Sequence, residues 1–277
     1  MLSREARRRV SLFAAILALV LVAIAVALAY RGYGFYKLSL EDRVEHPDFR
    51  KLRPSGAIGN GYGWVAALLV VLNLSYLIRR RFGGVGSMRR WLDIHVFTGL
   101  LAATLVSFHS AFQLRTPIAT ASTVSLALVV VTGLIGRFLY ALAPASSRDR
   151  LRDALDALDR LAPGFHEPLM GAIAEVPAPA IAANASLTRS LFAVPQWLRA
   201  GRARRRAVVA IAPRRPELRG AVAAVASAAA ADARAPGTAA LLRSWRGLHR
   251  LFALVMLAAV FLHAGVAWYY GYRWIFS

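Results

Sequence analysis

Five long apolar stretches limit what this chain can fold into. A helix needs about 20 consecutive apolar residues to cross the hydrocarbon core of a bilayer, because it rises about 1.5 Å per residue. Stretches of this kind occupy residues 10–30, 61–78, 91–113, 123–143 and 247–270. A backbone inside lipid must satisfy its own hydrogen bonds, which favours helices. The sequence therefore predicts an all-α integral membrane protein with five transmembrane helices.

Composition supports this class and excludes others. The chain is 58% hydrophobic with a mean hydropathy of +0.49, which is more apolar than a soluble domain of 277 residues needs. It contains no Cys, so disulfides, thiolate catalysis and Cys-ligated clusters are excluded. Its net charge of +21 gathers at the ends of the apolar runs and in one long connection, with no basic-aromatic module. We expect membrane topology to explain this charge, and no nucleic-acid partner.

The arginines predict an orientation. Four Arg lie in the first nine residues and five lie in 79–90, whereas the connection 114–122 holds only Arg115. Cytoplasmic loops carry an excess of basic residues, so we expect a multi-pass protein of a bacterial inner membrane, with its N-terminus cytoplasmic and its C-terminus periplasmic. Six basic residues in 31–60 oppose this assignment, but four acidic residues there offset most of them. The stretch 10–30 resembles a signal peptide, but its apolar part is longer than usual and predicts a retained span.

The expected organisation has three parts. Residues 1–143 hold the first four spans, 144–246 form an Arg- and Ala-rich cytoplasmic loop region, and 247–277 hold the fifth span with a short C-terminus. Leucines at 151, 155, 158 and 161 form a stripe that predicts an amphipathic helix over 148–161. Such helices lie on an anionic leaflet or dock on a partner. A solvated, loosely ordered loop is the alternative.

Two predicted spans each carry a pair of histidines. His95 and His109 lie on the third span, and His249 and His263 lie on the fifth. Each pair is separated by fourteen residues, which returns to within about 40° of the same helix face and spans about 21 Å along the axis. Each of these helices therefore presents two imidazoles in one direction, at two depths of the bilayer.

These four histidines predict two haems. Odd-numbered spans run in the same direction, so His95 and His249 share the cytoplasmic half, whereas His109 and His263 share the outer half. Two facing histidines at one level supply the axial pair of a six-coordinate haem iron. Taken singly, an intramembrane histidine can instead relay protons or form an interhelical hydrogen bond. His46 and His166 have no such partner and are expected to be ordinary polar loop residues.

Other residues near the predicted ligands fit cofactor binding or simple packing equally well. The small residues there are Gly99, Gly133, Gly136 and Gly265. A glycine lets a flat porphyrin approach the backbone, but small residues also pack membrane helices. Arg137 is a charge within the fourth span and suits a haem propionate, with an Asp93 contact or snorkelling as the alternatives. Asp93 itself could order a histidine, accept a quinol proton or cap its helix.

The two H-x13-H patterns on parallel spans resemble those of the di-haem b-type cytochromes of membranes. In the cytochrome b four-helix bundle, two same-direction helices each give two histidines at this spacing, and the ferric reductase and NADPH oxidase family places its pairs in its third and fifth helices. The resemblance covers residues 61–113, 123–143 and 247–270. The chain departs from these families, because it has no G-x-G-x-x-G motif after a strand and no quinone-site motifs of the quinol:cytochrome c type.

The resemblance implies a function in electron transfer. We expect a di-haem cytochrome b subunit that moves single electrons across the membrane within a larger respiratory or redox complex. A quinone or quinol is the expected small-molecule partner, and an iron–sulfur, flavin or multihaem cytochrome c subunit the expected redox partner. One alternative is a standalone ferric or oxygen reductase. Another is a non-haem transporter or assembly factor whose histidines relay protons or bind metal.

Overall fold

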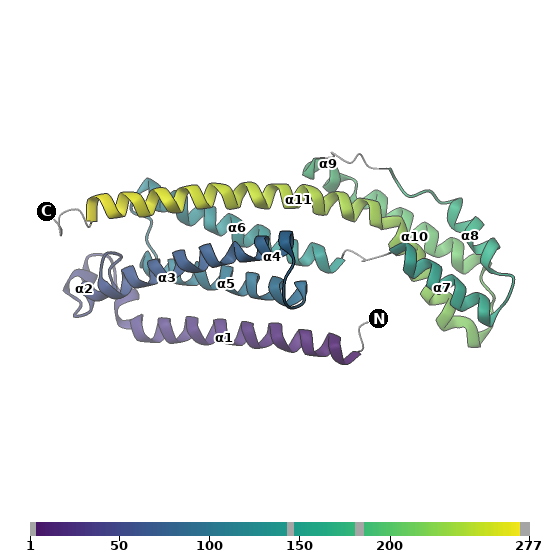
Figure 1. Ribbon diagram of the computed structural model, residues 1–277, viewed down its shortest axis with the longest axis horizontal. Helices are drawn as coiled ribbons and strands as arrows, with labels where there is room; N and C mark the ends of the chain where they lie inside the picture. Colours follow the sequence, from purple (N-terminus) through teal and green to yellow (C-terminus); the bar gives the residue numbers. More distant parts are fainter. Residues whose placement is uncertain (1–3, 143–146, 181–185, 272–277) are drawn as a thin grey trace. The chain divides into compact units, whose positions relative to one another are not determined.

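The computed structural model describes residues 4–142, 147–180 and 186–271, in which every regular element is a helix. This confirms the all-α prediction (Figure 1). The chain divides into two compact units. The first comprises Met1–Leu134 and Leu251–Ser277, and the second comprises Ile135–Arg250. Two long helices, α6 (Pro117–Leu142) and α11 (Arg219–Gly271), begin in one unit and end in the other.

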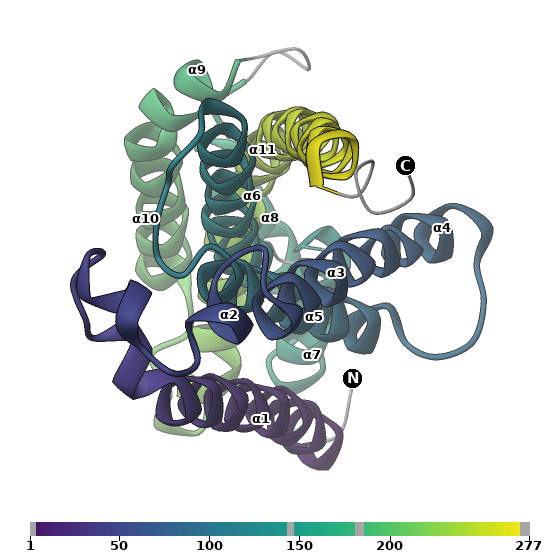
Figure 2. The same ribbon diagram turned by 90° about the vertical axis from the view of Figure 1, so that its left-hand side faces the viewer.

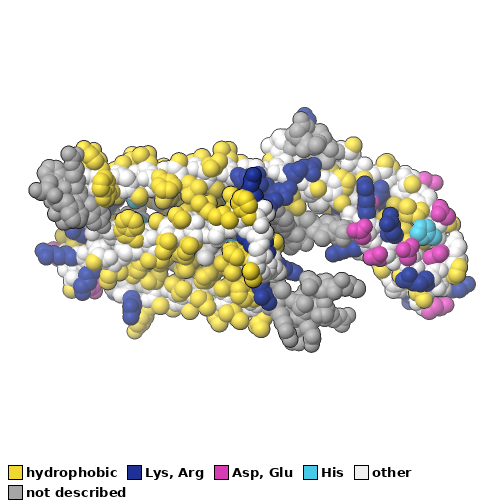
Figure 3. Space-filling model, viewed as in Figure 1, with side chains coloured by type: hydrophobic (Ala, Val, Ile, Leu, Met, Phe, Trp, Pro, Cys, Tyr) yellow, Lys and Arg dark blue, Asp and Glu magenta, His cyan; other side chains and the backbone are white. Residues whose placement is uncertain are grey.

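The described part of the chain contains five helical segments that are long and apolar enough to cross a membrane. They are Leu12–Tyr36, Phe49–Phe82, Met88–His109, Pro117–Leu139 and Pro216–Gly271. Most of their apolar side chains point outward, and Figure 3 shows hydrophobic side chains covering the helices of the first unit, with Lys and Arg gathered near their ends. Water would penalise such a surface, whereas lipid would not.

In the first unit, α1 (Arg4–Tyr36) and α3 (Ala57–Asn73) both pack against α5 (Met88–His109), as Figures 1 and 2 show. Short helical turns, η1 (Asp42–Glu45) and α2 (Phe49–Leu52), connect α1 to α3. A small core joins these turns to the ends of the long helices through Phe35, Leu52 and Ala111.

The second span differs from the single helix predicted over 61–78. It begins earlier, at Ala57, and is interrupted at Leu74, after which α4 (Ser75–Phe82) continues. The backbone N–H of Leu77 donates to the Leu74 carbonyl (2.9 Å), the tighter bonding of a 3₁₀ turn. The interruption leaves the last carbonyls of α3, including that of Asn73, at a helix end, where they need other donors.

The third span was predicted over 91–113 but begins and ends earlier, at Met88 and His109. Ser87 is the N-cap and accepts a hydrogen bond from the Arg90 backbone N–H (3.4 Å). Asp93 therefore does not cap this helix; it lies in the second turn and is 4% exposed. Positive φ angles at Ala111 (50°) and Phe112 (61°) turn the chain out of the helix just after His109.

Arg43 holds this turn in place. It is buried and donates to three backbone carbonyls, those of Ala111 (2.9 Å), Tyr36 (2.7 Å) and Leu38 (3.1 Å). These carbonyls lie at the C-terminal ends of α5 and α1, where a cation is favourable. One guanidinium thus fixes the ends of two helices that are distant in sequence.

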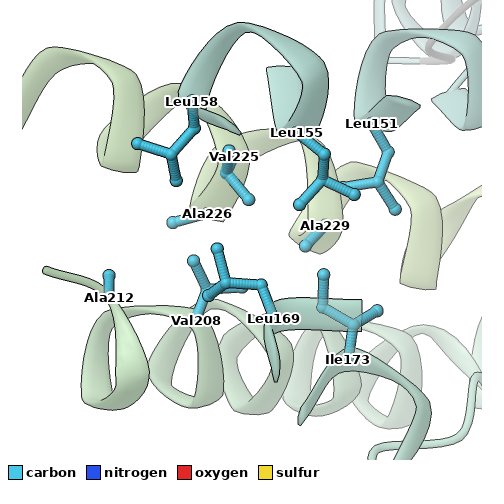
Figure 4. Packing of buried hydrophobic residues seen from close by; sticks show 10 residues of the cluster. All are labelled: Leu151, Leu155, Leu158, Leu169, Ile173, Val208, Ala212, Val225, Ala226 and Ala229. Atoms are coloured by element: carbon cyan, nitrogen blue, oxygen red, sulfur yellow. The ribbon is translucent and has the colours of Figure 1, made fainter. Parts of the chain in front are cut away.

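The second unit is a packed helical unit, so its described residues do not form the loosely ordered loop considered from the sequence. It contains α7 (Ser147–Leu161), α8 (His166–Ala174), α9 (Leu187–Phe192), α10 (Val194–Ile211), η2 (Pro216–Leu218) and the first part of α11. Its apolar core joins leucines of α7 to Leu169 of α8, Val208 of α10 and Ala226 of α11 (Figure 4).

The leucine stripe of α7 is confirmed in part. Leu151, Leu155 and Leu158 are buried, but Leu161 is 61% exposed. Residue 161 is rotated by about 80° from residue 151 on a regular helix, so it falls at the edge of the stripe in the last turn. The amphipathic helix is therefore as predicted, and Leu161 lies outside its buried face.

The fifth span is also longer than predicted. The Ala-rich segment and residues 247–270 form one continuous helix, α11, with Pro236 inside it. High helix propensity over the alanines accounts for this continuity. Residue 143 of the predicted fourth span and residues 272–277 of the C-terminus lie outside the described residues.

An ion pair crosses the second unit. Arg204 of α10 is buried and donates through Nη1 to Asp232 Oδ2 of α11 (2.8 Å) and through Nε to the Val176 carbonyl (2.8 Å). Ser147 at the start of α7 donates to the other oxygen of Asp232 (3.4 Å). These contacts join four segments of the unit: the start of α7, the residues after α8, α10 and α11.

The core of the second unit gives a first prediction. Leu158→Ala removes a fully buried side chain and should lower the local free energy of opening by about 3 kcal/mol, the usual result of a cavity in a core. Hydrogen exchange in α7, α8 and α10 should then be about a hundredfold faster. Leu161→Ala, on the same helix but exposed, is the control and should change exchange little. Equal effects of the two substitutions would contradict the described core.

Candidate functional site

Two of the four predicted ligands, His109 and His263, meet in the first unit. Their ring centroids are 6.2 Å apart and their planes are nearly perpendicular, at 84°. His109 ends α5, and His263 lies near the end of α11. Both side chains are half-buried, so part of each ring is left for another group to cover. The structure thus brings together the histidines predicted to form the outer pair.

The His109 ring is oriented by α3. Its Nδ1 lies 2.9 Å from the Gly59 carbonyl oxygen, which can only accept a hydrogen bond, so Nδ1 carries the proton. In the neutral imidazole, this places the lone pair on Nε2. A backbone carbonyl on one ring nitrogen commonly fixes the tautomer of a metal-binding histidine. The Gly59 carbonyl therefore favours the His109 tautomer whose Nε2 is available as an acceptor.

Gly63 lets the His109 ring lie against α3. A Cβ atom placed on Gly63 would be 2.8 Å from the Cε1 and Nδ1 atoms of His109, closer than real contacts allow. Gly59 and Gly63 are one turn apart on the same face of α3, the small-xxx-small spacing that lets membrane helices approach. The two glycines supply both the hydrogen-bond acceptor and the space for the ring.

The two histidine-bearing helices are in a common register. Ala102 lies midway between His95 and His109, and Met256 lies midway between His249 and His263, in each case on the histidine face. Both are buried in the same apolar cluster, with Val70 and Leu126. Ala102 and Met256 thus belong to one apolar cluster, and His109 and His263 meet; the members of each pair are separated by 154 positions in the chain. An apolar layer thus lies beside the His109/His263 pair, one heptad earlier on each helix.

His95 is also oriented by the second span. Its Nδ1 lies 3.4 Å from the Asn73 carbonyl, at the end of α3 that the interruption at Leu74 creates. The Tyr76 ring lies 4.8 Å from the imidazole. Thr98 donates to the Asn73 side-chain oxygen (2.8 Å) and so fixes Asn73 against α5. As at His109, a carbonyl of α3 accepts from Nδ1 and leaves Nε2 with the lone pair.

His249 belongs to the second unit. It is half-buried, and its ring stacks on Trp245 at 5.3 Å and 20°, one helical turn earlier on α11. Its predicted pairing with His95 stays a prediction.

The other predicted site residues have these surroundings. A Cβ on Gly136 would overlap the Trp245 indole, and a Cβ on Gly99 would lie 3.3 Å from the Asn73 side-chain nitrogen. The space beside these glycines is therefore taken by protein side chains. Arg137 is half-buried on α6 in the second unit. The haem-binding roles of Gly99, Gly136 and Arg137 stay predictions.

The remaining histidines have local roles. His46 accepts a hydrogen bond from the Asp48 backbone N–H through Nδ1 (3.1 Å) and packs against the Phe35 ring. His166 begins α8, and its Nδ1 lies 3.8 Å from a carboxylate oxygen of Asp156. Neither lies beside another histidine within the described residues.

Sequence reasoning missed Gly59, Gly63 and Asn73. The glycine-rich run GNGYG, residues 59–63 at the start of the second span, was a usable signal, because so many glycines in an apolar helix indicate close packing. Asn73 gave a second signal, since a carboxamide inside an apolar run needs a polar partner. Which side chain each would meet depends on helix packing.

The ring separation of the outer pair is that of a direct T-shaped contact, and it also equals the separation expected across one metal ion. An imidazole-bound metal ion lies about 2 Å from its nitrogen, so two imidazoles on opposite sides of one ion have centroids about 6 Å apart. The observed 6.2 Å agrees with this separation. In the described part of the chain, no cluster of three or more His, Asp, Glu or Cys side chains could hold a metal ion. His109 and His263 would hold the iron of a haem, and the porphyrin would supply the remaining nitrogen ligands.

Comparisons with protein families, with characterised proteins and with solved structures found no match to this chain. The geometry of the histidines is therefore the basis for assigning a function.

The glycine contact gives a second prediction. Gly63→Ala should push the His109 ring from the Gly59 carbonyl and lower the free energy of unfolding by about 2 kcal/mol, as overpacking does. Gly61→Ala is the control, because nothing lies within 4 Å of its Cβ position. It should be neutral or stabilising, since Ala favours helix. Thermal unfolding of the purified chain measures both, and an equal loss in both would contradict the described contact.

Proposed function

We propose that this protein is a di-haem b-type cytochrome that carries electrons across a membrane. The observation that supports it most is the meeting of His109 and His263, two histidines from helices far apart in sequence, at the ring separation that one bridging metal ion requires. A haem with two axial histidines supplies a one-electron couple. The surrounding protein tunes its potential by burial and hydrogen bonding.

Each haem would be held by one histidine from α5 and one from α11. His109 and His263 would hold the outer haem. Extending their register by two heptads assigns His95 and His249 to the second haem. Carbonyls of α3 accept from Nδ1 of both α5 histidines, which favours the tautomer that a metal ligand requires.

We further propose a location in a bacterial inner membrane. The five apolar helices support a membrane location, and the arginine distribution supports a cytoplasmic N-terminus and a periplasmic C-terminus. In this orientation the two haem levels lie about 21 Å apart along the membrane normal.

A complete electron path needs a donor and an acceptor. We propose a quinone or quinol at one haem, because it is a lipid-soluble redox partner. A separate iron–sulfur, flavin or multihaem cytochrome c subunit would serve the other haem.

The ligand assignment gives a third prediction, measured as haem b per chain by pyridine haemochrome absorbance. The unsubstituted chain should bind two haems and each single His→Ala variant one. Substituting both His109 and His263 should still leave one haem, because the pair serves a single iron. Substituting His95 and His109 together should leave none. His46→Ala and His166→Ala are controls and should keep two.

Three results would redirect the proposal. A colourless preparation with all four histidines intact would exclude the cytochrome and favour a proton-relay or metal-transport role. A single haem lost from the His95 and His109 double variant would show that these two share an iron. A purified chain that reduces ferric chelate without a partner would favour a standalone reductase.

A further inference from the structure

The outward face of α10 carries a stripe of arginines. On a regular helix, Arg199, Arg202, Arg205 and Arg206 fall within about 60° of one direction, and all four are exposed. The opposite face holds Trp197, Gly201, Arg204 and Val208, all of which are buried. Arg204 is neutralised by Asp232, so the helix sorts its arginines into one inward pair and one outward stripe.

This charge belongs to one side of the second unit. Residues 187–216 contain eight arginines and no acidic residue. In α7, four arginines alternate with four aspartates. Figure 4 shows the core leucines of α7 and Val208 of α10 pointing towards one another, so the outward faces of these helices lie on opposite sides of the unit. The side formed by α10 is strongly positive, whereas on the side formed by α7 the positive and negative charges are equal in number.

Apolar side chains lie within the arginine stripe. Leu198 (43% exposed) and Val209 (55% exposed) fall within about 40° of its centre. Phe192, just before α10, is 84% exposed. A face made only for water would not need these residues. Basic residues interleaved with exposed apolar ones are typical of helices that lie in the headgroup region of a bilayer.

We propose that the arginine stripe of α10 docks on the anionic phospholipid headgroups of the membrane leaflet. Guanidinium groups bind phosphate through paired hydrogen bonds, while Leu198 and Val209 enter the acyl boundary. Protein interfaces are typically anchored by aromatic residues, and single-stranded nucleic acids bind by stacking on them. The stripe itself holds no aromatic residue. Lipid is therefore the partner that its chemistry fits best.

Chain connectivity makes a weak attraction sufficient. The second unit continues directly into apolar helical segments at both ends, through α6 and α11. Tethering raises the local concentration of a binding surface without new contacts. Each arginine near an anionic leaflet raises the affinity of the surface for that leaflet roughly fivefold. Four arginines on one face of a tethered unit are enough for stable docking.

The absence of cysteine makes the test direct. A nitroxide on Val209→Cys would report membrane immersion in the full chain, placed in nanodiscs of phosphatidylcholine alone or mixed with phosphatidylglycerol. Phosphatidylglycerol should raise the collision rate of the label with oxygen and lower that with a water-soluble nickel complex. The same label on Asp153→Cys, on the outward face of α7, is the control and should stay in water.

Charge removal completes the test. Arg199→Gln, Arg202→Gln and Arg206→Gln together should shift the docking equilibrium about a hundredfold towards the free state. Removing Arg148, Arg150 and Arg152 of α7 in the same way changes net charge equally and should have little effect. A Val209 label that stays in water in anionic nanodiscs would overturn the proposal. A label that becomes inaccessible to the nickel complex only when another protein is added would also overturn it. Haem content should be the same in both triple variants, which separates this result from the electron-transfer proposal.

Discussion

A half-buried imidazole on an apolar helix needs polar partners, and the first unit is arranged around this need. The His109 ring lies at hydrogen-bond distance from the Gly59 carbonyl and also meets the His263 ring. Gly63 is required because any side chain there would displace the ring. The two histidine rings are kept together by three features of the fold. These are the close packing of α3 on α5, the end of α5 at His109 and the register of α11. Binding of an iron to both rings would offset the remaining cost of burying them.

The second unit satisfies its buried charge in another way. Arg204 and Asp232 form an ion pair at 2.8 Å, with Val176 and Ser147 supplying further hydrogen bonds. A charge of this kind inside a core is tolerated only when it is paired. The remaining arginines of α10 are turned outward. The same residue type therefore serves as a structural contact on one face of a helix and forms the proposed lipid-binding surface on the other.

Local sequence predicted much of this architecture, because helical periodicity and apolar length are local properties. The five apolar helices and the shared face of each histidine pair follow from the spacing of residues alone. The end of α5 does not, since Arg43, 68 positions away from Ala111, holds the turn that follows His109. The contact of Gly63 with His109 likewise depends on how two helices pack. The exposure of Leu161 could not be predicted either, because a regular spacing of leucines does not show which of them a neighbouring helix covers.

The most direct measurement is the anomalous scattering of iron from crystals of the purified protein. The account predicts two iron positions in each chain, one between the imidazoles of His109 and His263 and one between those of His95 and His249. Iron-free density between His109 and His263, or rings turned towards lipid, would contradict the account at its foundation.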